Sequence, residues 1–323
     1  MSLMLEPLPN WQSHDVTSLR AFARVRLIAL DVDATLLKGA DTQLSETIHR
    51  LQKFSISLRL KERVNVTLAT GRTLAGIKPL LPQLFLPGGV PLILYNGSVV
   101  INSATHETLL MRRIPRDILH RLLSLCANTG IGVLAYFYSD PDDSNFSTIL
   151  EPECVLGWSN TQHSKVEFNR MPVLWQPTWE WDGKEEPTAI LLDGMFDDPT
   201  LAAIQPDLAG LPDITTTRSG SRYVEIRPFN SNKGEALRVV AEKLGLPREA
   251  VLALGDNDND MEMLGWAGIG VCVADASPGA KSKSEYVCRY GAAEGAVELL
   301  RLVKQARRYF VRESLESKDR DNG

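Results

Sequence analysis

The sequence predicts an α/β fold, in which a second, α+β domain is inserted into a core built on a parallel β-sheet. Three observations predict it. Near both ends of the chain, short aliphatic runs are followed by polar loops and then by helical patterns, which is typical of a parallel α/β sheet. The middle of the chain mixes strands and helices without this order. The 323 residues also suit two domains, at about 100–200 residues per domain. The core is therefore expected to be Rossmann-like.

The first half of the core is predicted from three strands that each end in a polar cluster. The strands and clusters are 24–30 with Asp31-Val32-Asp33-Ala34-Thr35, 63–69 with Thr70-Gly71-Arg72, and 91–94 with Tyr95-Asn96-Gly97-Ser98. Helices are expected over 45–54, with Ser45 as N-cap, and from near Thr73. Because ligands of such sheets bind at the carboxyl ends of the strands, the clusters predict a site at one edge.

The middle of the chain has its own pattern. An amphipathic helix is expected over 115–128, and the other expected elements are strands 131–138, 188–195 and 223–226 and a helix over 199–208. The stretch 139–187 shows no regular pattern. We therefore predict an N-terminal extension (1–22), a first core part (23–105), an inserted α+β domain (106–222), a second core part (223–305) and a charged tail (306–323) that frays.

The second core part resumes the α/β pattern. A helix over 233–244 closes at Gly245, and a buried strand over 250–254 follows it. This strand ends in Gly255-Asp256-Asn257-Asp258-Asn259-Asp260. A helix over 261–264 and a strand over 268–273 complete the expected elements.

Composition narrows the class of protein. The net charge is −5, which argues against a general nucleic-acid binder but leaves room for an anionic small substrate at a locally positive site. The four cysteines are scattered without a CxxC pair, so buried, reduced thiols are expected rather than a zinc site. No run of 18 apolar residues and no apolar leader occurs, so we expect no membrane span and a cytoplasmic location.

The carboxylate clusters carry the chemistry. A carboxylate at the end of a buried strand is costly unless it is paired or bound to a metal. Asp31 and Asp33 are two residues apart after one strand, and Asp256 and Asp260 follow another. Several carboxylates gathered at one sheet edge require a cation, and ligands that are all oxygen suit Mg²⁺ best. Such a site is typical of phosphate chemistry.

Other sites of similar appearance are excluded by spacing. An EF-hand loop that begins at Asp256 would need Gly at its sixth position and Glu at its twelfth, where this chain has Met261 and Ala267. No GxxxxGK[ST] loop, HExxH helix or GxSxG turn occurs in the chain.

Four motifs in a fixed order make a resemblance specific. They are Asp31-x-Asp33-x-Thr35, Thr70-Gly71-Arg72, Lys233 and Gly255-Asp256-x-x-Asn259-Asp260. With them the chain resembles the haloacid dehalogenase-like hydrolase superfamily, and within it the Cof-type sugar-phosphatase-like subgroup. That subgroup carries a large α+β cap between its second and third motifs, which implies that the inserted domain is such a cap. The resemblance covers about residues 24 to 303.

The resemblance implies a role for each motif. Asp31 would be the nucleophile that forms an aspartyl-phosphate, and Asp33 the general acid and base. Thr70 would donate a hydrogen bond to the phosphoryl group, and Lys233 would add fixed positive charge. The residues expected to bind substrate are Thr70, Gly71, Arg72, Asn96 and Lys233. The residues expected to hold Mg²⁺ are Asp31, Asp33 through its backbone carbonyl, Asp256, Asn259 and Asp260.

Each of these residues also has a structural alternative. The alternatives are loop caps for Asp31 and Asp33, a helix N-cap for Thr70, a solvated helix residue for Lys233 and packing roles for Arg72 and Asn96.

The sequence departs from the family pattern at two points. Ala34 stands where the family usually has Gly, which would strain the turn if φ is positive. Asp275 stands in place of Asn in a late Gly-Asn-Ala element and could alter the preference for substrate or metal.

The function that the sequence predicts is a Mg²⁺-dependent phosphatase, a phosphoric monoester hydrolase. The expected substrate is a small phosphorylated metabolite, with a sugar phosphate as a candidate. Two alternatives remain: a phosphomutase of similar architecture, and a non-catalytic binding or regulatory protein on a phosphatase scaffold. Phosphate release without a bisphosphate activator would favour the phosphatase, and inertness toward a broad panel of phosphate esters would favour the binding protein.

Overall fold

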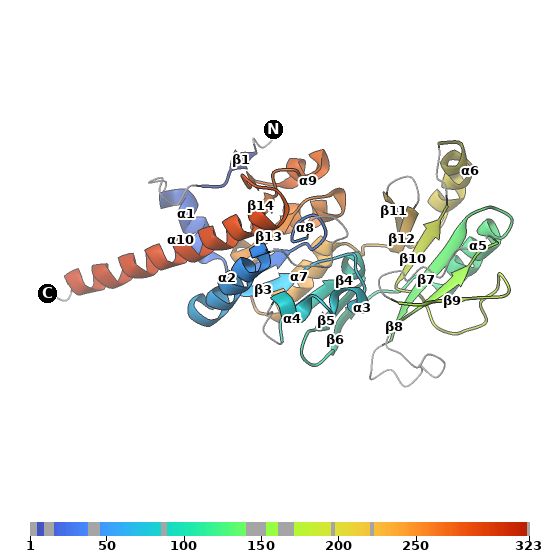
Figure 1. Cartoon of the computed structure of the whole chain (residues 1–323), viewed down its shortest axis with the longest axis horizontal. Coiled ribbons are helices and arrows are strands. Elements are labelled where there is room, and N and C mark those ends of the chain that lie inside the picture. Colours follow the sequence, from blue (N-terminus) through green and yellow to red (C-terminus); the bar gives the residue numbers. More distant parts are fainter. Residues whose placement is uncertain are drawn as a thin grey trace.

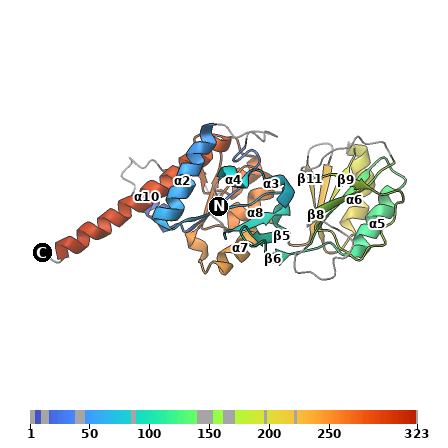
Figure 2. The ribbon, with the colours of Figure 1, turned by 60° about the horizontal axis from the view of Figure 1, so that its bottom comes forward.

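The computed structural model describes residues 5–9, 16–37, 46–84, 89–139, 153–160, 171–194, 198–219 and 223–321. They form two lobes, a core and a cap, and the chain enters and leaves the cap once (Figure 1). Figure 2 shows the two lobes side by side with short connections between them. The predicted fold class, an α/β core with an inserted α+β cap, is confirmed.

The core is a six-stranded sheet in which all paired strands are parallel. Its strands, in spatial order, are β1 (Glu6–Pro7), β15 (Tyr286–Val287), β14 (Ile269–Cys272), β13 (Val251–Gly255), β2 (Leu27–Leu30) and β3 (Asn65–Leu68). The two central strands, β13 and β2, are aliphatic and buried along their whole length, as expected for a sheet that is covered on both faces.

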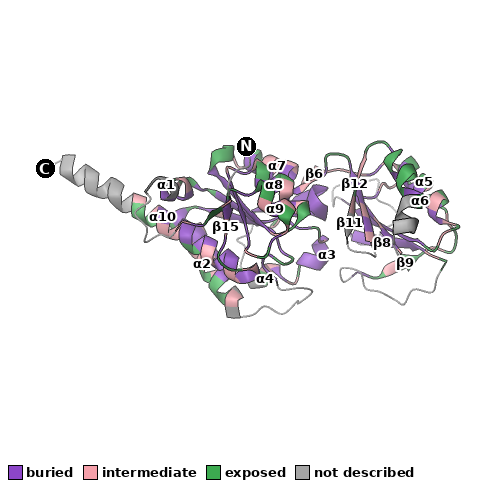
Figure 3. Ribbon diagram, turned by 90° about the horizontal axis from the view of Figure 1, so that it is seen from above, coloured by how far each residue is buried: buried purple, intermediate pink, exposed green. Residues whose placement is uncertain are grey.

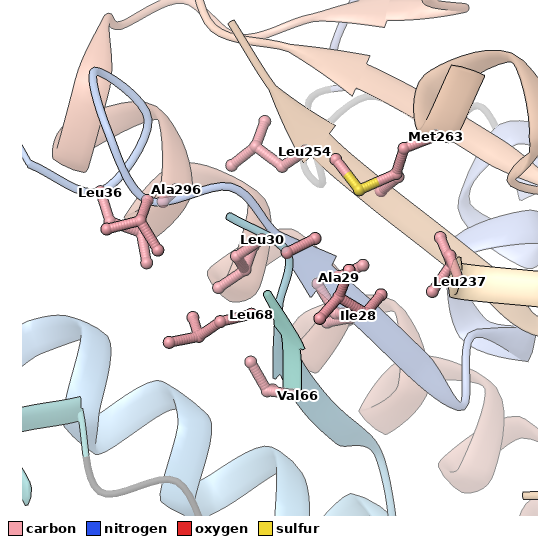
Figure 4. Packing of buried hydrophobic residues seen from close by; sticks show 14 of the residues in the cluster. Ile28, Ala29, Leu30, Leu36, Val66, Leu68, Leu237, Leu254, Met263 and Ala296 are labelled. Atoms are coloured by element: carbon pink, nitrogen blue, oxygen red, sulfur yellow. The ribbon is translucent and has the colours of Figure 1, made fainter. Parts of the chain in front are cut away.

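Helices cover the two faces of this sheet (Figure 3). On one face lie α1 (Val16–Arg24), α2 (Glu46–Glu62) and α10 (Ala292–Asp321), and on the other lie α7 (Lys233–Lys243), α8 (Met261–Trp266) and α9 (Pro278–Lys283). Figure 4 shows Ile28 and Leu30 of β2 packed with Val66 and Leu68 of β3 in this core, and Met263 of α8 packed over the same sheet.

A small antiparallel sheet extends the core on the side of β3. It contains β4 (Pro91–Leu94), β5 (Val99–Asn102) and β6 (Thr108–Met111). A parallel bridge between Ala69 and Ile93 brings β4 beside the end of β3. The short helices α3 (Leu74–Ile77) and α4 (Leu81–Leu84) lie in the connection from β3 to β4. The ends of β2, β3, β4 and β13 consequently share one edge of the core.

The cap is a six-stranded sheet with two helices on one face. Its strands, in spatial order, are β11 (Ile214–Ser219), β12 (Tyr223–Pro228), β10 (Ala189–Asp193), β7 (Gly132–Tyr138), β8 (Glu153–Trp158) and β9 (Val173–Trp175). The helices are α5 (Arg116–Cys126) and α6 (Asp198–Ala209). All strand pairs are antiparallel except β8 with β9.

Alternation along the cap strands gives the sheet two different faces. In β7, Val133, Ala135 and Phe137 belong to the apolar cluster shared with α5 and α6. Leu134 and Tyr136 point the other way and join the cluster of the core. The face of the cap sheet without helices therefore packs toward the core and its site.

The structure differs from the expected domain limits. In the pairing of β11 with β12, Ile214 lies opposite Pro228 and Ser219 lies opposite Tyr223. Residue 223 therefore belongs to the cap sheet, and the chain leaves this sheet only after Pro228. β6 pairs with β5, so it belongs to the core side although it follows residue 106. Pairing between strands cannot be inferred from composition, which is why both limits were misplaced.

Three strands of the cap were not predicted. β8 and β9 fall within 139–187, where no regular pattern was expected, and β11 precedes β12. β8 is buried on both faces, so its sequence lacks the alternation that indicates a strand, and β9 has only three residues.

One core helix is longer than expected, and the C-terminal helix α10 was not predicted. The predicted fraying after residue 306 is wrong, because α10 runs to Asp321 and no Gly or Pro interrupts its charged end. α2 extends to Glu62 rather than Phe54, and its predicted N-cap, Ser45, lies outside the described residues.

The cysteines and the helices agree with two composition-based expectations. All four cysteines are free and buried, and burial raises the pKa of the Cys126 and Cys154 thiols to about 12. Within the described part of the chain, no helix has the length and apolar character needed to cross a bilayer.

Candidate active site

Three carboxylates meet at the carboxyl edge of the core sheet. Asp31 directly follows β2, and Asp256 directly follows the neighbouring strand β13. Asp260 comes from the short turn η3 (Asp258–Asp260) in the same loop as Asp256. One oxygen of each carboxylate lies within 4.8 Å of the others, and Asp31 and Asp260 are 4% and 0% exposed. Three of the residues predicted as metal ligands thus lie together.

Lys233 joins this cluster from the opposite side. Its Nζ donates to Asp31 Oδ1 at 2.5 Å and to Asp260 Oδ1 at 2.6 Å, and its side chain is completely buried. Asn232 caps α7 by accepting from the backbone N of Glu235 at 2.8 Å, which places Lys233 in the first turn of the helix. The alternative that Lys233 is a solvated helix residue is therefore wrong.

The charges of the cluster are unbalanced. Burial raises the pKa of Asp31 well above its usual range, and the neighbouring Asp260 raises it further. Burial also raises the pKa of Asp256. Burial alone would lower the pKa of Lys233, but Asp260 and Asp31 outweigh it, so that the pKa rises and the ammonium stays protonated. One ammonium against three carboxylates leaves negative charge in excess.

The oxygen donors at this edge fit a small divalent cation. Asp260 Oδ2 is occupied by the backbone N of Asp256 at 2.9 Å and of Asn257 at 3.1 Å, and Thr35 Oγ1 donates to Asp256 Oδ1 at 2.9 Å. These bonds orient the carboxylates while leaving other oxygen atoms of Asp31 and Asp256 available. A set of oxygen ligands with excess negative charge is the kind that Mg²⁺ requires.

Asp33 lies on the same loop but faces another partner. Both oxygens of its carboxylate accept from Arg72, with Oδ1 2.5 Å from Nη2 and Oδ2 2.9 Å from Nε. The Asp33 side chain is about half exposed, whereas that of Arg72 is mostly covered. The structure therefore separates the Asp33 carboxylate from the three-carboxylate cluster and connects the first two sequence motifs through an ion pair.

The second motif forms a tight turn after β3. Thr70 is buried, and its Oγ1 accepts from the backbone N of Arg72 at 3.1 Å. This bond uses the oxygen of Thr70 as an acceptor and leaves its hydroxyl proton to be donated. At Gly71 a Cβ atom would lie 2.9 Å from Asn96 Nδ2, so glycine permits the close approach of Asn96.

Asn96 connects the core to the cap. Its Nδ2 donates to both carboxylate oxygens of Glu225 in β12, at 2.9 and 3.1 Å, and its Oδ1 accepts from Asn259 Nδ2 at 3.1 Å. Asn96 itself is buried in the left-handed region, with φ of 52°. The adjoining Gly97 has φ of 97°, and a Cβ there would lie 2.2 Å from Asn232 O. The alternative of a packing role for Asn96 agrees with this geometry, and its predicted contact with substrate stays a prediction.

Comparison with known proteins identifies the family and the fold. A family model described as haloacid dehalogenase-like hydrolase matches residues 28–300, which span all four motifs. The chain belongs to the haloacid dehalogenase-like hydrolase family. The HMP-PP phosphatase of Escherichia fergusonii is 30% identical over 257 residues, covering 78% of this chain and 85% of that protein. The 5-amino-6-(5-phospho-D-ribitylamino)uracil phosphatase YitU of Bacillus subtilis is 25% identical over 285 residues, covering 85% and 96%.

Solved structures show the same architecture. A HAD/COF-like hydrolase from Plasmodium vivax superposes with a TM-score of 0.68 at 19% identity, covering 90% of this chain and 98% of that one. The predicted family, with its Cof-type cap, is confirmed. The chain matches these two relatives over most of their length, and both are named phosphatases. The predicted enzyme class, a phosphoric monoester hydrolase, is therefore confirmed as well.

Ala34 differs from the usual haloacid dehalogenase-like pattern, and the backbone shows the consequence. Its φ is 60°, in the left-handed region that glycine adopts without strain. The residues on either side are Asp33 and Thr35, which contact Arg72 and Asp256 respectively. The chain therefore accepts a strained residue in the turn that presents its first motif.

Asp275, the second departure from the family pattern, lies away from the carboxylate cluster. It is exposed, and its carboxylate lies against Gly291, where a Cβ would be 2.5 Å from Oδ1. Asp275 is not among the described residues whose oxygens gather around Asp31. An effect of Asp275 on metal preference therefore has no support in the geometry.

Two cap carboxylates next to the site were not singled out from the sequence. Glu225 is one. Glu153, at the start of β8, is the other: it accepts from the backbone N of Leu74 and of Ala75, at 2.7 and 2.6 Å, and from Tyr95 Oη at 2.6 Å. For Glu153 the available signal was a glutamate at the start of an otherwise apolar strand. The partner of such a glutamate depends on which part of the core faces the cap.

Proposed function

We propose that this chain is a Mg²⁺-dependent phosphatase that hydrolyses a phosphate monoester of a small metabolite by transferring the phosphoryl group to Asp31. The observation that carries the proposal is the buried Asp31 carboxylate, which Lys233 contacts at 2.5 Å beside two further carboxylates. A carboxylate attacks an anionic phosphate only where positive charge offsets the repulsion. Lys233 supplies one such charge, and the oxygen donors around Asp31 suit a second.

Mg²⁺ would be held by Asp31, Asp256 and Asp260, with Asn259 and the backbone carbonyl of Asp33 as further ligands. When bound, it supplies the charge that neutralises the phosphoryl oxygens and orients them for in-line attack. The excess negative charge of the three carboxylates supports this assignment.

The reaction proceeds in two steps. An oxygen of Asp31 attacks phosphorus, the ester P–O bond breaks, and the leaving oxygen takes a proton from Asp33. A water molecule then attacks the aspartyl-phosphate and gives its proton to Asp33, which releases inorganic phosphate and restores Asp31. Arg72, which contacts Asp33 at 2.5 Å, keeps that carboxylate on the open side of the loop.

Two further residues would bind the phosphoryl group. Thr70 donates its hydroxyl proton, which its bond to the Arg72 backbone leaves available. Lys233, held between Asp31 and Asp260, provides a fixed charge that needs no rearrangement during the reaction. Gly71 and Arg72 line the same turn and complete the proposed substrate contacts.

The names of the relatives support the substrate class. One acts on HMP-PP and another on a 5-phospho-D-ribitylamino-uracil, so a small phosphorylated metabolite is the proposed substrate. A sugar phosphate is one candidate. The predicted cytoplasmic location stays a prediction.

The test is phosphate release from a panel of sugar phosphates, nucleotides and cofactor phosphates, with Mg²⁺ and with EDTA. Turnover is expected only with Mg²⁺, and Asp31→Asn should lower it by at least about 1,000-fold because the nucleophile is lost. Asp258→Asn is the matched control: Asp258 is exposed in the same acidic loop and accepts from Ser277, so this variant should stay within about threefold of wild type.

Two results would contradict the proposal. Turnover by Asp31→Asn at the wild-type rate would exclude the aspartyl-phosphate route. Return of the phosphoryl group to another hydroxyl of the substrate, instead of release as inorganic phosphate, would assign the chain to the phosphomutases.

A further inference from the structure

The cap contributes one acidic side chain to the network around the carboxylate loop. In β12, Val224 and Ile226 pack with the cap helices, so Glu225 and Arg227 project from the opposite face, toward the core. Glu225 is the cap residue that contacts Asn96.

A positive charge from the same strand lies beside Glu225. Arg227 Nε lies 4.0 Å from Glu225 Oε1, and the Arg227 side chain is only 7% exposed. The other nitrogens of Arg227 are committed: Nη1 donates to Ser231 O at 3.1 Å and Nη2 to Thr217 Oγ1 at 2.8 Å. The fixed guanidinium of Arg227 therefore places a positive charge beside the Glu225 carboxylate.

An ionised carboxylate accepts hydrogen bonds but cannot donate them. Glu225 therefore requires that Asn96 present its Nδ2, at 2.9 and 3.1 Å, because Oδ1 in that place would face a negative charge. Asn96 Oδ1 is then directed at Asn259, which must offer its own Nδ2, at 3.1 Å. The charge of Glu225 thus sets the orientation of the Asn96 amide, and through it that of the Asn259 amide.

The second amide lies inside the proposed metal loop. Asn259 directly precedes Asp260, whose carboxylate contacts Lys233 at 2.6 Å. With Nδ2 used by Asn96, the free end of Asn259 is its carbonyl oxygen, Oδ1, which has no hydrogen-bond partner among the residues that the structure describes. An oxygen is the end that a divalent cation binds.

We propose that Glu225 is a positioning residue for the phosphatase site: through Asn96 it fixes the amide of Asn259 with its carbonyl oxygen free for the cation, so that the metal loop is fully oriented only when the cap is docked. The inference rests on the proposed function. Glu225 acts through other side chains, so its removal affects the cation and the phosphoryl group rather than the recognition of the leaving group.

The experiment replaces Glu225 by an isosteric neutral group, Glu225→Gln. A glutamine amide can face Asn96 with either end, so the orientation of the two amides is no longer fixed. We expect Mn²⁺, used in place of Mg²⁺ and measured by electron paramagnetic resonance without substrate, to bind about 10-fold more weakly. We expect kcat to fall by about 10-fold or more, by the same factor for p-nitrophenyl phosphate and for sugar phosphates, with KM little changed.

A double-mutant cycle and a control complete the design. Asn96→Ala should weaken Mn²⁺ binding by itself, and Glu225→Gln in that background should add little, because both changes break one connection. Glu180→Gln makes the same exchange at an exposed cap residue and should leave Mn²⁺ affinity and kcat unchanged. If Glu225→Gln does not fold, the Mn²⁺ affinity of Asn96→Ala is the test: weaker binding supports the inference, and unchanged binding overturns it.

The inference is overturned if Mn²⁺ affinity is unchanged, or if the two substitutions are additive. It is also overturned if the loss lies in KM and differs between leaving groups, since Glu225 would then contact the substrate. A wild-type chain that hydrolyses no ester would refute the proposed function alone, because the Mn²⁺ titrations need no turnover.

Discussion

Lys233→Met removes an ammonium from the carboxylate cluster while keeping a side chain of similar length. Lys233 is completely buried and contacts two buried carboxylates, at 2.5 and 2.6 Å. Removing one partner of a buried ion pair costs about 3–5 kcal/mol, because the remaining charge stays uncompensated. Burial already raises the pKa of Asp31, so Asp31 can take up a proton in the variant and recover part of this cost. We therefore expect a loss of about 3 kcal/mol at neutral pH without Mg²⁺.

Urea unfolding in EDTA measures this loss, and Mg²⁺ provides an internal check. Because a bound cation replaces the missing charge, saturating Mg²⁺ should stabilise Lys233→Met more than it stabilises the wild type. Lys243→Met is the matched control, since Lys243 lies at the other end of α7 with its side chain 58% exposed, and it should cost less than about 0.5 kcal/mol. A loss below 1 kcal/mol for Lys233→Met, or an equal gain from Mg²⁺ in both proteins, would refute the reasoning.

Three further outcomes follow from the strained turn and from the contact of Glu153 with the core. Ala34→Gly should raise the free energy of unfolding by about 0.5–1 kcal/mol in thermal melts, because φ is 60° and glycine adopts this conformation without strain; a lower melting temperature would contradict it. Glu153→Ala should cost about 2–4 kcal/mol and accelerate hydrogen exchange at the Leu74 and Ala75 amides, which donate to Glu153; unchanged exchange there would show that the contact is not maintained in solution. Burial raises the pKa of Glu153, so the folded state binds its proton more tightly than the unfolded state, and the stability of the wild type relative to Glu153→Gln should fall as the pH rises above the usual range of a glutamate; a difference that grows with pH would reverse the assigned sign.

The core could be predicted from the sequence because each of its signals is local. Aliphatic runs give the parallel strands, and the polar residues that end them fall at one edge in any sheet of this kind. Asp31 and Asp256 therefore lie together for a reason that needs no knowledge of the cap. Lys233 required the resemblance, because a lysine in the first turn of a helix is usually exposed.

The limits of the cap could not be predicted because they depend on which strands pair. β12 reads as a strand whether it lies in the core or in the cap, and only its pairing with β10 and β11 decides. Glu153 and Glu225 were missed for the same reason. A glutamate in a buried strand indicates a partner, but the partners Ala75 and Asn96 come from the core, whose position against the cap is a tertiary property.

A short stretch of chain connects the cap directly to Lys233. β12 ends at Pro228, and the chain reaches Lys233 through a short connection whose Ser231 O accepts from Arg227 at 3.1 Å. The backbone of Asn232, which caps the helix that carries Lys233, lies against Gly97 in the turn beside Asn96. A displacement of the cap sheet would therefore move Lys233 through the connecting chain, and it would move the carboxylate loop through Asn96. Since the lysine and the carboxylates must meet for the proposed chemistry, we expect docking of the cap and assembly of the site to be coupled.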